Sequence, residues 1–185
     1  WHEFIFEECY KQDLLCFSSP FDLKSVKFLE TLNNPIYKIA SSEVNHIPLI
    51  ELVTKSKKPV IFSTGAALEN DIRLFIDTAR KNKNKDITVL QCTAKYPSKV
   101  EDANLNNMSK IRDNYHVKVG LSDHTTSNLT SIIATSLGAQ VIEKHFKLNN
   151  KIDSPDSSFS LIPKAFESLV QDIRATEKAI KLKVH

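Results

Sequence analysis

A regular alternation of short β-type runs and longer helical patterns constrains the fold of this chain more than any other feature. The β-type runs are rich in β-branched and aromatic residues, and a helical pattern follows each of them. They occupy residues 14–21, 36–43, 58–65, 87–97, 117–125 and 140–146, and residues 1–12 precede them as a helix. Strands joined by helices of this size run parallel, because a parallel pair needs a long crossover connection. The sequence therefore predicts an α/β fold with six strands.

Composition limits the possible functions. The 185 residues are 41% hydrophobic, which suits a single domain spanning residues 1–185 with its own core. The net charge is only +3 and both signs are interspersed, so nothing indicates a nucleic-acid or membrane partner. No apolar run reaches the roughly 20 residues of a membrane helix, and the acidic N-terminus is unlike a signal peptide. We expect a cytoplasmic protein whose three cysteines, Cys9, Cys16 and Cys92, are reduced.

Each predicted strand ends in small polar or ionisable residues. The endings read "SSPF", "SSE", "STG", "CTAKYP", "SDHT" and "EKHF". Ligand sites of doubly wound sheets and of (β/α)8 barrels lie at the carboxyl ends of the strands, so these side chains converge on one rim. The chain has three glycines, with no dinucleotide fingerprint and no phosphate-loop lysine motif. These features favour a TIM barrel, here incomplete, with about six of its eight βα units.

The stretch "VIEKHF", residues 141–146, carries three ionisable residues inside an apolar run. Strand side chains alternate between two faces, so Glu143 and His145 share one face while Lys144 lies on the other. We expect the stem of Lys144 to extend between the surrounding helices. The same alternation in "VGLSDHT" places Ser122 and His124 together. Two histidines at neighbouring strand ends predict a site for Mn²⁺, Fe²⁺ or Zn²⁺.

Several of these motifs together resemble a known family. "GLSDHT", "SLGAQVIEKHF" and "SPDSSFSL", with "YKIASSE", "VIFSTG" and "QCTAKYPS", are similar to the sialic-acid-type nonulosonate synthases. The resemblance covers nearly the whole chain and is strongest to the pseudaminic acid synthase branch. It implies an enzyme, a transferase that condenses phosphoenolpyruvate with an open-chain N-acetylated amino sugar. The product is a nine-carbon sugar, and phosphate is released.

The resemblance also implies roles for individual residues. His124 and His145 match the ligands of a divalent metal, usually Mn²⁺, and with Lys38 and Glu143 they match the catalytic set. The positions that hold phosphoenolpyruvate match Ser19, Lys38, Ser41, Ser63, Thr93 and Ser122. The positions that face the sugar match Glu43, Tyr96, Glu143 and Asp156. A Lewis acid, an anion-binding lysine with hydroxyls, and carboxylates for proton transfer are what such a condensation requires.

Each of these residues has an ordinary structural alternative. The serine and threonine hydroxyls at strand ends could cap the helices that follow. Tyr96, before Pro97, could be a packing residue at a turn, and Asp156, after Pro155, could be a turn residue. Lys38 could be a solvated strand residue, although a lysine within "IYKIA" is costly to bury without an anion.

The chain departs from the family pattern at three positions and in length. Ala94 follows the Cys-Thr pair where a small polar residue is usual, Lys147 replaces a threonine, and Ser154 replaces a glycine. A complete barrel takes about 250 residues. We therefore expect the first two βα units and the C-terminal antifreeze-like domain to be absent. In the family these parts supply an essential glutamate, a second phosphoenolpyruvate-binding lysine, and an arginine that reaches the site of the second subunit of a homodimer.

Three alternatives remain open from the sequence. The product could be N-acetylneuraminate or legionaminate. The chain could be a non-catalytic relic that binds metal or sugar without turnover. A different metal-dependent barrel aldolase would use pyruvate in place of phosphoenolpyruvate. We expect this chain alone to have weak activity or none.

Overall fold

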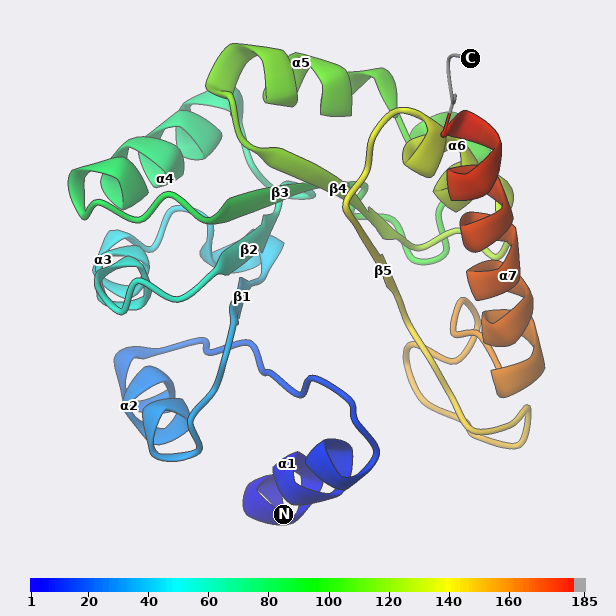
Figure 1. Ribbon diagram of the computed structural model, residues 1–185, viewed down its shortest axis with the longest axis horizontal. Coiled ribbons are helices and arrows are strands. Elements are labelled where there is room, and N and C mark those ends of the chain that lie inside the picture. The colour runs from blue at the N-terminus through cyan, green and yellow to red at the C-terminus, as the bar shows by residue number, and fades with distance from the viewer. Residues whose placement is uncertain (182–185) are drawn as a thin grey trace. The chain divides into compact units, whose positions relative to one another are not determined.

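The computed structural model describes residues 1–181 and divides into two compact units, Trp1–Val89 and Leu90–His185. The five strands follow one another in the sheet in chain order, β1-β2-β3-β4-β5 (Figure 1). The pairings of β1 with β2 and of β4 with β5 are parallel. The α/β prediction is therefore confirmed, and each unit is described in turn.

The first unit alternates helices with short buried strands. Its elements are α1 (His2–Lys11), α2 (Leu23–Thr31), β1 (Tyr37–Ile39), the 3-10 turn η1 (Ser41–Glu43), α3 (Ile47–Lys55), β2 (Val60–Ser63) and α4 (Glu69–Lys81). The strand β3 (Ile87–Cys92) begins in this unit. Every residue of β1 and β2 is buried, as expected for parallel strands covered on both faces.

Local sequence signals explain where these helices begin. The carboxylate of Asp22 accepts a hydrogen bond from the backbone N–H of Ser25 at 2.7 Å, which caps the first turn of α2. The carboxylate of Asp71 accepts one from the N–H of Leu68 at 2.8 Å at the start of α4. The face of α4 then packs on the sheet, where the ring of Phe75 stacks on Phe62 with centroids 3.9 Å apart. This contact joins helix to strand in the core of the first unit.

The predicted strand at residues 14–21 is wrong. Ser18 forms only a single parallel bridge, with Tyr37, and the side chains of Leu14 and Leu15 are 62% and 65% exposed. The N–H of Ser18 donates to the side-chain oxygen of Asn34 at 3.1 Å, so a side chain takes up the donor that a strand partner would use. The apolar run satisfied the strand pattern, but its backbone lacks the pairing that makes a strand.

The second unit repeats the alternation. After the end of β3 it contains η2 (Val100–Asp102), α5 (Asn106–Tyr115), β4 (Lys118–Asp123), α6 (Leu129–Ser136), β5 (Val141–Lys144) and α7 (Pro163–Ile180). Gly120 is paired with Val141 and Asp123 with Lys144, so β4 and β5 end side by side. α6 and α7 lie next to each other along β5 (Figure 1).

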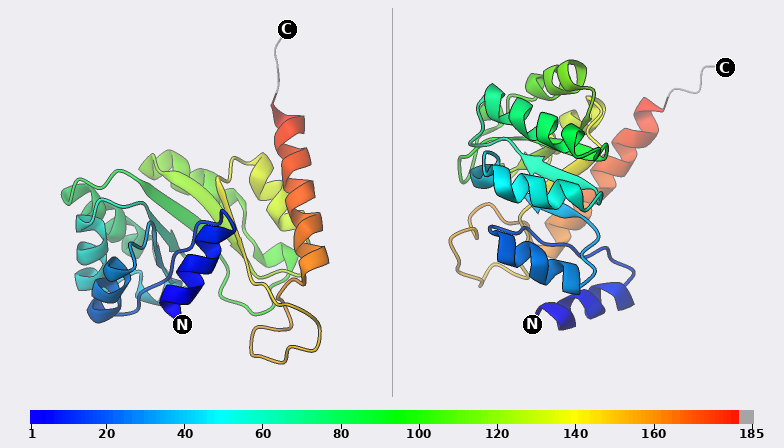
Figure 2. Two further views of the ribbon diagram at one scale, coloured as in Figure 1. Left: turned by 60° about the horizontal axis from the view of Figure 1, so that its bottom comes forward. Right: turned by 90° about the vertical axis from the view of Figure 1, so that its left-hand side faces the viewer.

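A long loop connects β5 to α7 and is drawn in orange in Figure 2. It returns to the end of β5, because the N–H of Leu161 donates to the carbonyl of His145 at 2.9 Å. The N–H of Lys147 donates in turn to the carbonyl of Leu161 at 2.9 Å. The loop is therefore fixed at both of its ends.

Among residues 1–181 no helix combines the length and the apolar character needed to cross a membrane.

Gly120 permits the close approach of β4 to β5. A Cβ atom at this position would lie 2.3 Å from the carbonyl oxygen of Val141 and 2.6 Å from a methyl carbon of Leu90. We predict that Gly120→Ala lowers the free energy of unfolding by about 1–3 kcal/mol, because the strands must separate. Urea denaturation measures this, with Ser136→Ala on the exposed side of α6 as the control. Equal stability of Gly120→Ala and the unmodified chain would contradict the predicted overlap.

Candidate functional site

The paired ends of β4 and β5 form the centre of the candidate site. Ser122 is the register partner of Glu143, and Asp123 is the partner of Lys144. His124 and His145 directly follow these pairs, and their ring centroids lie 5.3 Å apart. The structure thus brings together the two imidazoles that strand alternation placed on one face.

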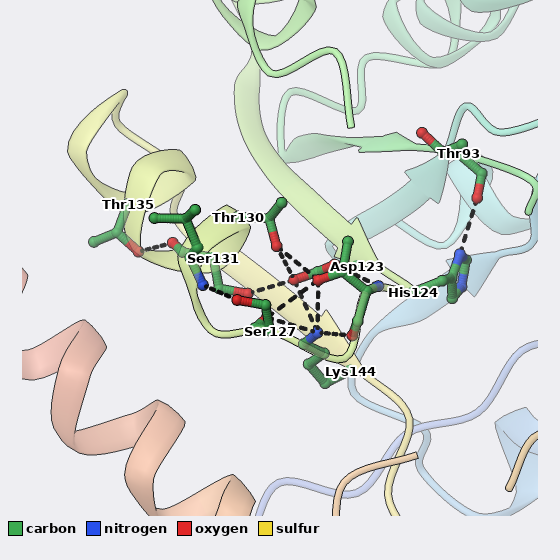
Figure 3. Close-up of polar contacts among 10 residues, drawn as sticks. Thr93, Asp123, His124, Ser127, Thr130, Ser131, Thr135 and Lys144 are labelled. Atoms are coloured by element: carbon green, nitrogen blue, oxygen red, sulfur yellow. Dashed lines mark hydrogen bonds and ion pairs between the residues drawn. The ribbon is translucent and has the colours of Figure 1, made fainter. Parts of the chain in front are cut away.

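A hydrogen bond to the backbone carbonyl of Thr93 holds His124 in one tautomer. Its side chain is buried, and Nδ1 lies 3.0 Å from the carbonyl oxygen of Thr93 (Figure 3). A carbonyl oxygen can only accept, so Nδ1 carries the proton and Nε2 keeps its lone pair. Burial lowers the pKa of His124 and the facing His145 lowers it further, while the Thr93 carbonyl acts in the opposite direction. The ring is therefore neutral at pH 7, the form that binds a metal.

His145 lies in a more open position. Its Nδ1 is 3.5 Å from a carboxylate oxygen of Asp156, and the two side chains are 35% and 57% exposed. The ring of Phe159, itself buried, packs edge-on against His145 at 4.8 Å and against His124 at 5.8 Å between centroids.

The polar groups beside the imidazoles also match the prediction of a shared face. The hydroxyl of Ser122 donates to a carboxylate oxygen of Glu143 at 2.6 Å. The ring of Tyr96 lies 4.3 Å from that of His124 between centroids. Partial burial raises the pKa of Tyr96, and the nearby Cys92, Asp156 and Glu143 raise it further. The Tyr96 phenol therefore stays protonated at neutral pH and can donate a hydrogen bond.

Lys144 does not extend between the helices, so that prediction is wrong. Its ammonium lies 2.9 Å from a carboxylate oxygen of Asp123, with side chains that are 1% and 2% exposed. Burial acts to raise the pKa of Asp123, but the Lys144 charge and the hydrogen bonds from Thr130 and Thr125 outweigh burial and lower it. Both residues lie on the strand face opposite the histidines, where the buried carboxylate provides a better partner than solvent.

The donors at this site fit a divalent cation that takes part of its coordination from other molecules. Two imidazoles that can coordinate through Nε2 suit Mn²⁺, Fe²⁺ or Zn²⁺. Nδ1 of His124 has the carbonyl oxygen of Thr93 as its acceptor, the usual support for a metal-binding histidine, and a carboxylate oxygen of Asp156 lies 3.5 Å from Nδ1 of His145. Among residues 1–181, no three His, Cys, Asp or Glu side chains are grouped closely enough to hold a metal. A cation held by the two imidazoles would therefore take its remaining ligands from outside the described part of the chain.

The first unit contains four of the six residues predicted to bind phosphoenolpyruvate. Lys38 in β1 is 9% exposed, and Ser63 at the end of β2 is 2% exposed. Among the described side chains, the hydroxyl of Ser63 is buried with no hydrogen-bond partner. The hydroxyl of Ser41 accepts from the N–H of Gly65 at 2.9 Å. Neither serine caps a helix, so the capping alternative does not apply to them.

The other predicted residues lie as follows. Ser19 is half-buried and directly follows the Ser18 bridge, and Glu43 accepts a hydrogen bond from the neighbouring Ser42 at 2.7 Å. In the second unit the hydroxyl of Thr93 donates to the carbonyl of Asp102 at 2.8 Å. Asp156 lies in the exposed part of the β5–α7 loop. The structure assigns no ligand to these residues, and their roles stay predictions.

Sequence reasoning missed two residues that shape the site, Phe159 and Asp123. Asp123 could have been found, because alternation places it on the same face as Lys144 at the same depth in the next strand. Phe159 gave no comparable signal. It reaches the histidines only because the loop folds back at Leu161.

Comparisons with known proteins show which family the chain is similar to. The NeuB family model matches residues 1–185. Pseudaminic acid synthase of Helicobacter pylori is 46% identical over 180 residues, which cover 97% of this chain and 53% of the relative. N,N'-diacetyllegionaminic acid synthase of Campylobacter jejuni is 37% identical over 181 residues, covering 97% and 54%. The N-acetylneuraminic acid synthetase of Leptospira borgpetersenii, solved with citrate, has a TM-score of 0.94 at 28% identity, covering 98% and 64%.

These relatives define a class, the synthases of sialic-acid-type sugars. The chain belongs to the NeuB family. The resemblance inferred from its motifs is confirmed, including its similarity to pseudaminic acid synthases. The chain spans about half the length of the curated relatives that it matches.

The lowered pKa of His124 predicts how stability depends on pH. The pKa of His124 in the folded chain lies below the ordinary 6.5. As the pH falls below 6.5, His124 therefore takes up a proton more readily in the unfolded chain than in the folded one. The contribution of His124 to stability is complete above that pH and decreases below it. Urea unfolding between about pH 8 and pH 5 measures this effect. As the pH falls, the free energy of unfolding should decrease less in His124→Asn than in the unmodified chain. An imidazole that titrates by NMR at or above its ordinary pKa would contradict the prediction.

Proposed function

We propose that this chain carries part of the active site of a synthase that condenses phosphoenolpyruvate with an open-chain N-acetylated amino sugar, releasing phosphate. We place the enzyme in the pseudaminic acid synthase type, because a pseudaminic acid synthase is 46% identical to this chain. The observation that carries it is the pairing of His124 with His145, whose ring centroids lie 5.3 Å apart at neighbouring strand ends. Family membership supplies the class of reaction.

In this proposal the second unit receives the sugar. His124 and His145 hold a divalent cation, with Mn²⁺ as the first candidate, and the cation would polarise the sugar aldehyde. Glu143 keeps a carboxylate beside that position, oriented by the Ser122 hydroxyl, and can accept or return a proton. Phe159 packs against one side of the imidazole pair and shields that side from solvent.

The anionic donor is assigned to hydroxyls and a lysine. Lys38, Ser41 and Ser63 would bind the phosphate and carboxylate of phosphoenolpyruvate, with Ser19, Thr93 and Ser122 as further contacts. A buried hydroxyl without a partner, such as that of Ser63, is a position where a ligand oxygen restores a hydrogen bond. The sugar is assigned to Glu43, Tyr96, Glu143 and Asp156.

The finer features of the whole protein are also proposals. We place the chain within a closed TIM barrel whose other βα units lie outside these residues, in a cytoplasmic homodimer. The strand order follows the chain, as in a (β/α)8 barrel. A legionaminate or N-acetylneuraminate product remains a second possibility, because synthases with those names also match.

The direct test is phosphate release from phosphoenolpyruvate and the amino sugar in the presence of Mn²⁺. For the 185-residue chain alone we expect weak release or none, because it spans about half of its relatives, while calorimetry should still detect Mn²⁺ binding. We expect His145→Ala to weaken that binding strongly and His46→Ala, at the start of α3, to preserve it. Full turnover by this chain would contradict the need for further units.

A chimera separates an enzyme from a relic. The matching segment of the Helicobacter pylori relative is replaced by this chain, to which it is 46% identical, and phosphate release is measured. We expect Mn²⁺-dependent release that is lost in His145→Ala. A folded chimera that binds Mn²⁺ without releasing phosphate would indicate a binding relic, and one that consumes pyruvate would indicate an aldolase.

Ser63 allows ligand binding to be separated from stability. Its buried hydroxyl has no hydrogen-bond partner, so Ser63→Ala should leave the free energy of unfolding unchanged or raise it by up to about 1 kcal/mol. The same change should weaken phosphoenolpyruvate binding in calorimetry, because the ligand loses a hydrogen bond. Ser131→Ala is the contrast, since its hydroxyl donates to Asp123 at 2.8 Å and its loss should destabilise the chain. Unchanged phosphoenolpyruvate affinity in Ser63→Ala would remove this residue from the site.

A further inference from the structure

The carboxylate of Asp123 is the centre of a buried polar cluster, which we define as Asp123, Thr125, Thr130, Ser131 and Lys144. Figure 3 shows Asp123 with Thr130, Ser131 and Lys144 around it. One carboxylate oxygen accepts from the hydroxyls of Thr130 at 2.7 Å and Ser131 at 2.8 Å and from the Lys144 ammonium at 2.9 Å. The other accepts from the N–H of Thr125 at 2.9 Å. The carboxylate therefore has a donor on each oxygen and a countercharge beside it.

This cluster cannot touch a substrate. The side chains of Lys144 and Asp123 are 1% and 2% exposed and lie on the strand face opposite His124 and His145. Burying two charges requires desolvating both, and a well-packed apolar pair of similar volume is often as stable or more so. Stability alone therefore does not account for an ion pair at this position. What the pair adds is a fixed geometry.

The fixed geometry acts on both histidines. Asp123 and Lys144 immediately precede His124 and His145, and they are register partners across β4 and β5. The Lys144 ammonium also donates to the carbonyl oxygens of Thr125, at 2.5 Å, and Ser127, at 3.4 Å. The backbone is thus tied down on both sides of His124, by Asp123 before it and by Thr125 after it.

We propose that Asp123 and Lys144 are positioning residues, which set the relative placement of the His124 and His145 imidazoles through the ends of β4 and β5. This inference rests on the proposed function in one respect, which is that the two imidazoles are placed to bind a metal. Loss of the pair frees the two strand ends to shift independently. The imidazoles then spend less time in the arrangement that binds one cation.

The test uses the full 185-residue chain and Mn²⁺ alone as the probe. Asp123→Asn keeps the shape of the side chain and removes its charge, and we expect calorimetry to show Mn²⁺ affinity reduced about 10- to 100-fold, as for other residues that support metal ligands. Asp102→Asn is the matched control. It removes an ion pair with Lys95 of 2.6 Å, in which Lys95 is 60% exposed, and should leave Mn²⁺ affinity unchanged.

A second variant and a metal-free measurement cover the case in which Asp123→Asn does not fold. The double variant Asp123→Asn with Lys144→Met leaves no unpaired charge in the cluster. The metal-free measurement is long-range proton–nitrogen NMR of the imidazoles, which reports the tautomer of His124. We expect one Nδ1-protonated form in the unmodified chain and a mixture of tautomers in the variants.

The combined outcomes separate the inference from the proposed function. If the unmodified chain binds Mn²⁺ and the folded variants bind it equally well, the positioning role is overturned and the metal site stands. If the unmodified chain binds no Mn²⁺ but its single His124 tautomer becomes mixed in the variants, positioning is supported and the proposed metal site is overturned. If neither the Mn²⁺ affinity nor the His124 tautomer changes in the folded variants, the positioning role is overturned whether or not the unmodified chain binds Mn²⁺.

Discussion

The ammonium of Lys144 and the carboxylate of Asp123 meet at 2.9 Å where β4 and β5 end, almost completely removed from solvent. The two residues are register partners, so the residues that follow them lie beside each other on the opposite face of the strands. Those residues are His124 and His145, with Ser122 and Glu143 one step earlier on the same face. Under the proposed positioning role, the placement of the two imidazoles depends on this ion pair on the opposite face of the strands.

The two units contribute different chemistry. The second unit offers two imidazoles, one of them with Nδ1 hydrogen-bonded to the Thr93 carbonyl and the other near the Asp156 carboxylate, together with the Glu143 carboxylate and the Tyr96 phenol. The first unit offers the buried lysine Lys38 and the buried hydroxyl of Ser63, and that hydroxyl has no hydrogen-bond partner among the described residues. Groups of these kinds are those that an anion with several oxygens requires. The proposed function assigns the sugar mainly to the groups of the second unit and the anionic donor mainly to those of the first.

Sequence periodicity predicted the parts of this structure that depend on local backbone geometry. Strand alternation placed His124 with Ser122 and His145 with Glu143, because that period follows from the pleated backbone. It failed for residues 14–21, where the outcome depended on whether a pairing partner existed, and Asn34 took that role with its side chain. It also misplaced Lys144 and missed Phe159, since both find their neighbours through contacts between elements.

The claim that His124 and His145 bind one cation can be tested most directly by X-ray absorption spectroscopy of the Mn²⁺-loaded chain. The fine structure at the manganese edge distinguishes imidazole nitrogen from water or carboxylate oxygen through scattering by the ring atoms. We predict two imidazoles per metal ion, falling to one in His145→Ala. A spectrum of the unmodified chain that shows only oxygen ligands, or a single imidazole unaffected by that substitution, would contradict the claim.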